Sequence, residues 1–500
     1  MQLFEDAVFS GPVTFNNESG FRFDSTAEFQ SDFIVNSAYL FPARPESQLI
    51  INGDITPGDV SILASNEATI SIPWITSMGA NNPALKLEAT GENSSITLPN
   101  LETLTPPVPG QGNTGNAMEL IARFGGTVNL PSLTTINRGR VRLIVNNEGS
   151  SLQLPAIQKI EGPEEGLTAR VDVKNSGQLV AGPITSLDFT DLELDETVDY
   201  PITDLTSMTN GLLEIDAFKP DLSNLDTIEN LSLTVFGGGV IEFPGITSIT
   251  LDRNEWKADG ESSAIRFPDL TQITGAQTTS GATLLRALRG GRVELPALTT
   301  LDGYFQIRST NDNSVVDLSA LIALTSIQDR LSLLEATSGG TINLADTVLT
   351  GGDVSTTETG TLSGNTITTA TGSEVTGPGT LSSSLTNQAL IKLDRDTGPI
   401  VVEGNLILDT DSRIEVTVGL GSEFTGSGKL EVTGAATLGG TIEIIQRGSY
   451  SPQVGDQFEI ITYSSKSADF QTLEGLALKN DLVGELEITD TSVTLKVVAP

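Results

Sequence analysis

The chain has 500 residues, contains no histidine and no cysteine, and carries 64 acidic against 27 basic residues, for a formal net charge of −37. These absences exclude a Ser-His-Asp triad, a cysteine nucleophile, disulfide bonds, and imidazole or thiolate metal ligands. An acidic surface repels nucleic acids and anionic membranes, so we expect neither as a partner. No apolar run reaches the ~18 residues that a membrane span needs, so we expect no membrane insertion by this chain.

The first segment, residues 1–45, holds eight of the 18 phenylalanines. Pairs such as Phe21/Phe23 and Ala27/Phe29 alternate with polar residues, which predicts short strands that point two side chains inward. We expect aromatic stacking to close this end of the structure, and the alternative is an end that joins subunits. The opening MQLFED lacks the basic and apolar regions of a signal peptide.

Residues 46–345 repeat one phrase: a β-branched residue, a polar residue, Leu or Phe, Pro, and then a Thr-rich run with Leu or Ile. Clear copies are ITLPNLETL from Ile96, VNLPSLTTI from Val128, LQLPAIQKI from Leu152, IEFPGITSI from Ile241, IRFPDLTQI from Ile265 and VELPALTTL from Val293. The prolines recur about every 25 residues, and a fixed period of this length is typical of a solenoid.

Apolar and polar residues alternate on both sides of each proline, which is the periodicity of strands. Because proline cannot donate to a strand ladder, we place it at a corner between two short strands. A third alternating run precedes the phrase, for example VRLIV from Val141 and FQIRS from Phe305. Three strands per coil predict an all-β, right-handed parallel β-helix in a single elongated rod. A leucine-rich-repeat horseshoe is the alternative, but its recurring asparagine is missing.

The phrase, together with its following alternating run, resembles the repeats of receptor L domains over about residues 70–335. Those domains are small right-handed β-helices that bind other molecules. The resemblance therefore implies a binding module, and it supplies no catalytic residues.

Two sets of residues are candidates for a site. The segment DRNEWKADGESS from Asp252 reads as a projecting loop, in which Trp256 could stack on a sugar ring beside Asp252 and Glu255; a local packing role for the tryptophan is the alternative. In the run DLELDETVD from Asp191, alternation places Asp191, Glu193 and Asp195 on one strand face, where three carboxylates could hold a hard cation such as Ca²⁺. The alternative is a solvated outer face. We expect no other cofactor.

Residues 346–395 consist mostly of Thr, Ser and Gly. Leu362, Ile367 and Leu381 recur at strand-like intervals, so we predict narrower coils of the same rod, with a flexible linker as the alternative. Residues 396–500 resemble the C-terminal part of autotransporter-type bacterial surface β-helix proteins. The resemblance rests on the run from Lys429 to Thr441 and on Tyr450, Pro452, Gly455, Asp456, Phe458, Ile460 and Phe470. It implies export and a stable cap.

The leading hypothesis is an extracellular structural or adhesive β-helix protein of a bacterial cell surface or matrix, possibly self-assembling, and not an enzyme. Its partners would be other copies of itself, or a surface glycan or protein. The first alternative is a polysaccharide-degrading β-helix enzyme or tailspike that uses the carboxylates named above. Against it, aromatic residues make up only 5% of the chain, whereas sugar clefts need stacking surfaces. The second alternative is a glycan-binding module centred on Trp256.

Overall fold

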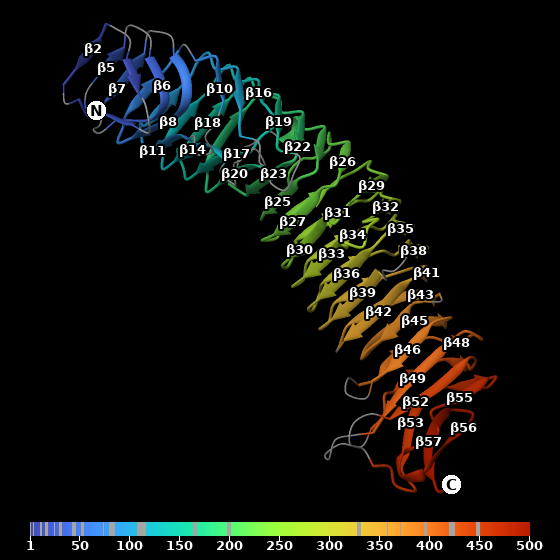
Figure 1. Ribbon diagram of the computed structural model, residues 1–500. Helices are drawn as coiled ribbons and strands as arrows, with labels where there is room; N and C mark the ends of the chain where they lie inside the picture. The colour runs from blue at the N-terminus through green and yellow to red at the C-terminus, as the bar shows by residue number, and fades with distance from the viewer. Residues whose placement is uncertain are drawn as a thin grey trace. The chain divides into compact units, whose positions relative to one another are not determined.

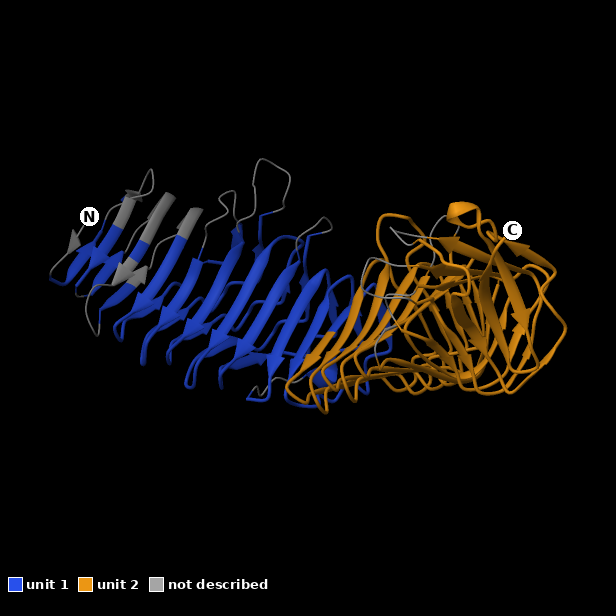
Figure 2. Cartoon of the chain, turned by 90° about the horizontal axis from the view of Figure 1, so that it is seen from below, with its two compact units in different colours: residues 1–233 blue, residues 234–500 orange. Residues whose placement is uncertain are grey.

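The computed structural model divides into two compact units, residues 1–233 and 234–500, which are coloured separately in Figure 2. It describes all residues except 1, 4, 11–12, 16–18, 25, 30–32, 43–46, 52–54, 74, 80–85, 108–116, 164–167, 198–201, 328–331, 358, 371, 395–397, 420–425 and 447–450. The described residues form β-strands and two short 3-10 helices, η1 (Ile202–Asp204) and η2 (Lys479–Asp481). No described helix is long and apolar enough to cross a membrane.

Three ladders of parallel strands run along each unit, and a complete coil contributes one strand to each ladder. Successive coils are visible as successive arrows in Figure 1. In the first unit, for example, Leu120 pairs with Leu143, Val128 with Leu152, and Leu104 with Ile136. The predicted all-β, parallel β-solenoid with three short strands per coil is therefore confirmed. Its right-handed sense stays a prediction.

The described residues of the first unit form the following strands in these ladders. The first ladder contains β1 (Gln2–Leu3), β3 (Val13–Phe15), β4 (Ser19–Phe23), β6 (Phe33–Pro42), β8 (Ile55–Ser65), β11 (Lys86–Thr90), β14 (Met118–Arg123), β17 (Val141–Asn146), β20 (Ala169–Lys174), β23 (Thr190–Asp195) and β25 (Leu212–Asp216). The second contains β2 (Ala7–Phe9), β5 (Ala27–Phe29), β7 (Gln48–Ile51), β9 (Thr69–Ser71), β12 (Ser95–Thr97), β15 (Thr127–Asn129), β18 (Ser151–Leu154) and β21 (Gln178–Ala181). The third contains β10 (Ser77–Gly79), β13 (Thr103–Thr105), β16 (Thr135–Ile136), β19 (Lys159–Glu161), β22 (Ser186–Asp188), β24 (Ser207–Thr209) and β26 (Thr227–Glu229). Strand β27 (Ser232–Phe236) follows.

The second unit repeats the arrangement. Its first ladder contains β30 (Glu255–Asp259), β33 (Thr283–Leu288), β36 (Phe305–Thr310), β39 (Ser332–Thr337), β42 (Gly352–Thr357), β44 (Glu374–Thr376), β46 (Leu390–Leu393), β49 (Arg413–Val418), β52 (Thr441–Gln446) and β55 (Thr472–Glu474). The second contains β28 (Val240–Glu242), β31 (Ala264–Arg266), β34 (Arg292–Glu294), β37 (Val315–Asp317), β40 (Thr341–Asn343), β47 (Ile400–Val402), β50 (Leu430–Val432) and β53 (Gln457–Thr462). The third contains β29 (Ser248–Thr250), β32 (Gln272–Thr274), β35 (Thr300–Asp302), β38 (Ala323–Thr325), β41 (Asp346–Thr350), β48 (Leu406–Leu408), β51 (Ala435–Thr437) and β54 (Ser465–Ser467). Two longer strands, β43 (Thr361–Thr369) and β45 (Gly379–Asn387), belong to both the second and third ladders.

The interior consists of stacked aliphatic side chains from the alternating positions of the repeat. Ile265, Val293 and Val316 follow one another in register and are fully buried. Full burial of a side chain of this size stabilises the fold by about 1.5–3 kcal/mol. The prolines of the phrase, such as Pro268 and Pro296, lie in the turns between the second and third ladders, as predicted.

A buried serine joins consecutive coils at the corner between the first and second ladders. The Ser314 hydroxyl accepts a hydrogen bond from the Gly290 N–H of the preceding coil (2.9 Å) and donates one to the Thr310 carbonyl (2.7 Å). Ser150 makes the same two bonds, to the Gly125 N–H and the Asn146 carbonyl, at 3.0 and 2.7 Å. The repeated serine satisfies a backbone donor that the turn leaves unpaired.

Ser314→Ala should therefore lower the free energy of unfolding by about 1–3 kcal/mol, because it leaves the Gly290 N–H without a partner in the interior. Chemical denaturation followed by circular dichroism measures the change. Ser319→Ala, at an exposed position of the next turn, is the matched control and should stay within about 0.5 kcal/mol of the unmodified chain. Equal effects of the two substitutions would contradict the role of the corner serine.

The two ends of the chain are built differently. Near the N-terminus, Phe21, Phe23 and Phe29 are buried as predicted, and Phe9 stacks on Phe29 with ring centroids 4.5 Å apart. Whether this end caps the solenoid or joins subunits stays a prediction. At the C-terminal end, β57 (Ser492–Val498) runs antiparallel to both β53 and β56 (Val483–Ile488). This antiparallel closure was not foreseen from the sequence.

The Thr/Ser/Gly-rich segment continues the ladders of the second unit. Leu362 pairs with Leu381, so the coil here is shorter than the one that separates the paired residues Ile265 and Val293. By composition, the sequence divides into residues 1–45, 46–345, 346–395 and 396–500. The structure instead has one boundary between compact units, after residue 233.

Candidate functional site

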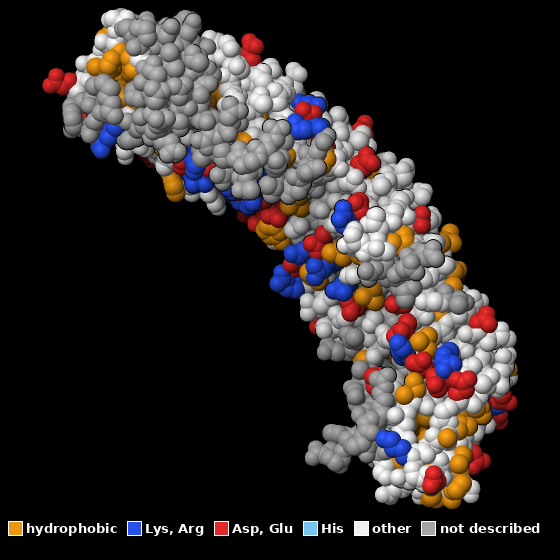
Figure 3. Space-filling model, viewed as in Figure 1, with side chains coloured by type: hydrophobic (Ala, Val, Ile, Leu, Met, Phe, Trp, Pro, Cys, Tyr) orange, Lys and Arg blue, Asp and Glu red, His pale blue; other side chains and the backbone are white. Residues whose placement is uncertain are grey.

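The first ladder of the first unit exposes a broad outward face, because its strands are longer than those of the other two ladders. We call the outward side chains of β11, β14, β17, β20, β23 and β25 the long-strand face. Figure 3 shows Lys and Arg beside Asp and Glu over this part of the chain. Glu119 of β14 bridges Lys86 of β11 and Arg142 of β17 at 2.8 and 3.2 Å. Opposite charges one coil apart thus cross-link neighbouring strands.

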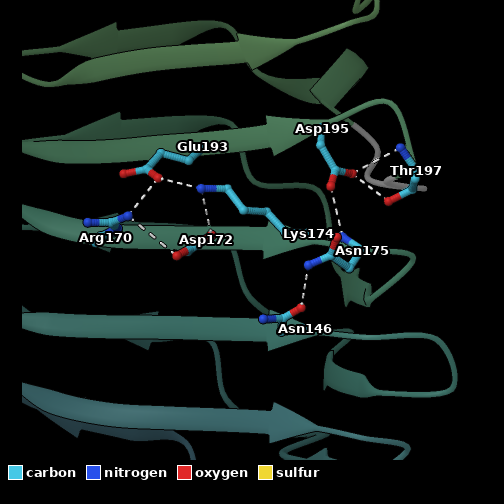
Figure 4. A network of polar contacts seen from close by, with 8 residues as sticks. All are labelled: Asn146, Arg170, Asp172, Lys174, Asn175, Glu193, Asp195 and Thr197. Carbon is cyan, nitrogen blue, oxygen red and sulfur yellow. Dashed lines mark hydrogen bonds and ion pairs between the residues drawn. The ribbon is translucent and has the colours of Figure 1, made fainter.

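The centre of the long-strand face is a network around Glu193 on β23 (Figure 4). The Glu193 carboxylate accepts bonds from Arg170 at 2.7 Å and from Lys174 at 2.9 Å, both on β20. Asp172, between these two cations, lies 3.4 Å from each. Only 6% of Glu193 is exposed. Burial lowers the pKa of Lys174, but its bond to Glu193 and the charges of Asp172 and Glu193 outweigh that effect and raise it. The lysine therefore remains a fixed cation.

Asp195, the last residue of β23, makes a second set of contacts (Figure 4). Its carboxylate accepts the backbone N–H of Asn175 at 2.8 Å and that of Thr197 at 2.9 Å. The Asn175 amide in turn donates to the Asn146 side chain at 2.8 Å. Three consecutive strands, β17, β20 and β23, are held together at this edge, so their outward side chains have fixed positions.

The predicted carboxylates Asp191, Glu193 and Asp195 do share one outward face of β23. Asp191 accepts a hydrogen bond from the Thr168 hydroxyl, and burial raises the pKa of this carboxyl. Among the described residues, no three acidic side chains lie close enough to hold a metal ion. The contacts fit an ion-pair network better than a cation site, and Ca²⁺ binding stays a prediction.

Sequence reasoning missed Arg170 and Lys174, which neutralise Glu193, and Asp172, which shares both cations with it. Their alternation in the run ARVDVK did indicate one outward face. The missing information was the register, which sets Asp172 directly beside Glu193.

The loop predicted around Trp256 is wrong: Glu255–Asp259 is strand β30, with Trp256 pointing inward. None of the tryptophan surface is exposed, and its ring stacks on Phe267 with centroids 4.6 Å apart and planes 8° from parallel. A ring without an exposed face cannot stack on a sugar in this structure. The physical reason is the alternation of Trp256 and Ala258 with charged residues, which is a strand pattern.

The two carboxylates predicted beside Trp256 point outward and have cationic partners. Glu255 pairs with Arg286 on β33 at 2.8 Å, and Asp252 pairs with its neighbour Arg253 at 3.2 Å. The structure therefore separates them from the tryptophan ring, which lies inside the coil. A sugar site built from all three side chains is not assembled here.

A second cluster of titratable groups lies on the first ladder of the second unit. Asp353 on β42 accepts the backbone N–H of Glu374 at 2.9 Å, and Lys392 on β46 pairs with Glu374 at 2.7 Å. Burial raises the pKa of Asp353 to about 6, and the charge of Glu374 adds to the effect.

Asp353→Asn should consequently stabilise the second unit at pH 7 and change little at pH 4. The raised pKa means that the folded state holds the proton more tightly, so stability falls as the pH rises from ~4 through about 6. The side chain is half exposed, and solvent screening limits the expected gain to about 1 kcal/mol. Thermal unfolding of both proteins at pH 4 and pH 7 measures it. An equal difference at the two pH values would contradict the titration of Asp353.

Each unit is a parallel β-solenoid whose described charged residues form ladders on its outward faces. A comparison with models of protein families found no match, and a comparison with curated proteins found none either. Among solved structures, the Haemophilus influenzae Hap adhesin is similar at 14% sequence identity and a TM-score of 0.26. The alignment covers 96% of this chain and 64% of the adhesin chain, so this chain spans less than two thirds of the adhesin. So distant a likeness assigns no function.

Proposed function

We propose that this chain is an extracellular structural or adhesive protein of a bacterial cell surface or matrix. Its outward faces contact a surface glycan or protein, or other copies of the chain. The main support for this proposal is the long-strand face, where ion pairs and hydrogen bonds between coils hold charged side chains in place. A face whose side chains are already fixed loses little conformational entropy on contact, which favours binding.

The contacts of the candidate carboxylates favour binding over catalysis. Glycoside hydrolysis needs two carboxylates on either side of one bond, one of which donates a proton. Glu193 lies between Arg170 and Lys174, and Glu255 is paired with Arg286. Both carboxylates are therefore engaged by cations on neighbouring strands rather than available to a glycosidic bond. We accordingly propose adhesion and no hydrolysis.

A retention assay tests this proposal. Microspheres coated with the full chain would be washed over surfaces bearing neutral glycans, acidic glycans, matrix proteins, or a layer of the chain itself. We expect retention above that of albumin-coated microspheres on at least one surface, with no new reducing ends released. Retention on none of these surfaces would overturn adhesion, and released reducing ends would establish the enzymatic alternative.

The role of the long-strand face can be separated from that of the rest of the molecule. The variant Arg170→Glu places a third carboxylate beside Asp172 and Glu193 and removes one of the two cations that neutralise them. We expect a loss of retention on acidic or protein surfaces if this face makes the contact. Arg266→Glu, on the second ladder of the other unit, is the matched control, because it also reverses an arginine that is paired with a glutamate.

A further inference from the structure

One corner of the first unit exposes an aromatic ring in a strained backbone conformation. Phe124 follows β14, is 61% exposed, and has a φ of 52°. Bulky residues rarely adopt positive φ, at a cost of roughly 1–2 kcal/mol. The next two coils place Asn147 and Asn175 at the same corner, also with positive φ, and asparagine tolerates this conformation. Packing does not account for phenylalanine here, because most of the residue is exposed.

Two polar groups that lack partners among the described residues lie at the same corner. The Arg123 side chain makes no hydrogen bond or ion pair with other described residues, and its Nε atom is buried. The Oδ1 atom of Asn147 is also buried and lacks a donor among the described residues. Arg123 pairs in register with Asn146, so Phe124 and Asn147 are the next residues on neighbouring coils. An arginine without a carboxylate partner is unexpected in a chain with 64 acidic residues.

A carboxylate on the preceding coil completes the corner. A Cβ atom added to Gly125 would lie 3.0 Å from the Cγ atom of Glu92, and Gly91 donates its N–H to the Arg123 carbonyl at 3.0 Å. The corner therefore combines an exposed aromatic residue and an exposed carboxylate with a guanidinium and an amide whose buried Nε and Oδ1 atoms lack partners among the described residues, on three adjacent coils. Hydrogen bonds from backbone groups, such as Gly125 N–H to Ser150, fix the turn itself.

We propose that this corner, formed by Glu92, Arg123, Phe124 and Asn147, binds a neutral sugar residue of an uncharged polysaccharide. The inference rests on the proposed adhesive function and gives it a ligand class. A phenyl ring stacks on the apolar face of a pyranose, while the guanidinium, amide and carboxylate pair with its hydroxyl groups. A neutral sugar fits because Glu92 and the net charge of −37 repel acidic glycans.

The variant Phe124→Asn tests the site without relying on a loss of fold. Asparagine suits a positive φ, so the melting temperature should stay unchanged or rise, while binding to the neutral polysaccharide should fall at least tenfold. Phe124→Gly, which suits the same backbone conformation, should give the same result. Binding would be measured by affinity electrophoresis of the full chain in gels containing dextran, mannan or galactan, with alginate as the acidic probe.

Ile322→Asn is the matched control, because Ile322 is 59% exposed on the other unit. It should bind the neutral polysaccharide like the unmodified chain. The proposal would be overturned if the Phe124 variants bound normally, if they melted at lower temperature, or if the chain bound only alginate. Absence of any polysaccharide binding would also overturn it. Adhesion itself would still stand if the coated microspheres were retained on protein surfaces or on the chain itself.

Discussion

Replacing Trp256 with alanine should lower the free energy of unfolding of the second unit by about 3–5 kcal/mol. The ring is fully buried and stacks on Phe267 of the same coil, so its removal leaves a cavity in the interior. Urea unfolding followed by circular dichroism measures the loss. Trp256→Phe keeps an aromatic ring against Phe267 and should cost less than half as much.

This pair of variants also separates packing from sugar binding at Trp256. If the tryptophan acts only in packing, Trp256→Phe should leave polysaccharide binding unchanged. A loss of binding in Trp256→Phe at unchanged stability would contradict that role and restore the site predicted from the sequence.

Gly291→Ala should lower the free energy of unfolding by about 3 kcal/mol or more, at least as much as Trp256→Ala. The reason is that the structure has no room for a side chain at this position. A Cβ atom at Gly291 would lie 2.2 Å from the carbonyl oxygen of Ala258 on the preceding coil. Backbone atoms cannot rotate away from such a clash, so the coils would have to separate. The same approach recurs at Gly126, where the Cβ atom would lie 2.3 Å from the Ala89 oxygen.

The matched control for Gly291 is Gly426→Ala, because a Cβ atom there would meet no atom of the described residues within 4 Å. The expected change in melting temperature is close to zero for Gly426→Ala and several degrees or more for Gly291→Ala. Similar, small effects of both substitutions would show that the coils at Gly291 are not held as closely as the structure indicates.

The repeat could be predicted from the sequence because its determinants are local. Alternating residues such as those of VELPALTTL fix which side chains enter the interior, and Pro296 must lie at a turn. Trp256 was misplaced although its strand shows the same alternation. Its charged neighbours Glu255, Lys257 and Asp259 resemble a solvated loop, whereas they occupy outward positions of β30 or its end.

The candidate site could be predicted only in part, since its partners come from different coils. The outward direction of Glu193 follows from Leu192 and Leu194, but its pairing with Arg170 depends on the number of residues in the intervening turn. Phe124 could not be recognised at all. Phenylalanine in an apolar run is expected in the interior, and only its positive φ and exposure distinguish it from Phe21 or Phe267.

A solenoid that acts through its outward faces requires coils that can be removed without loss of fold, and the most direct measurement is the thermal unfolding of a one-coil deletion. Arg292 pairs in register with Val315, so these two residues occupy equivalent positions of neighbouring coils. Removal of residues 292–314 deletes one coil and joins Gly291 directly to Val315. We expect this variant to fold and to melt within a few degrees of the full chain. Removal of 292–313 shifts the register by one residue and should turn outward side chains into the interior, giving unfolded or aggregated protein. If both deletions behaved alike, the stack of equivalent coils described above would be contradicted.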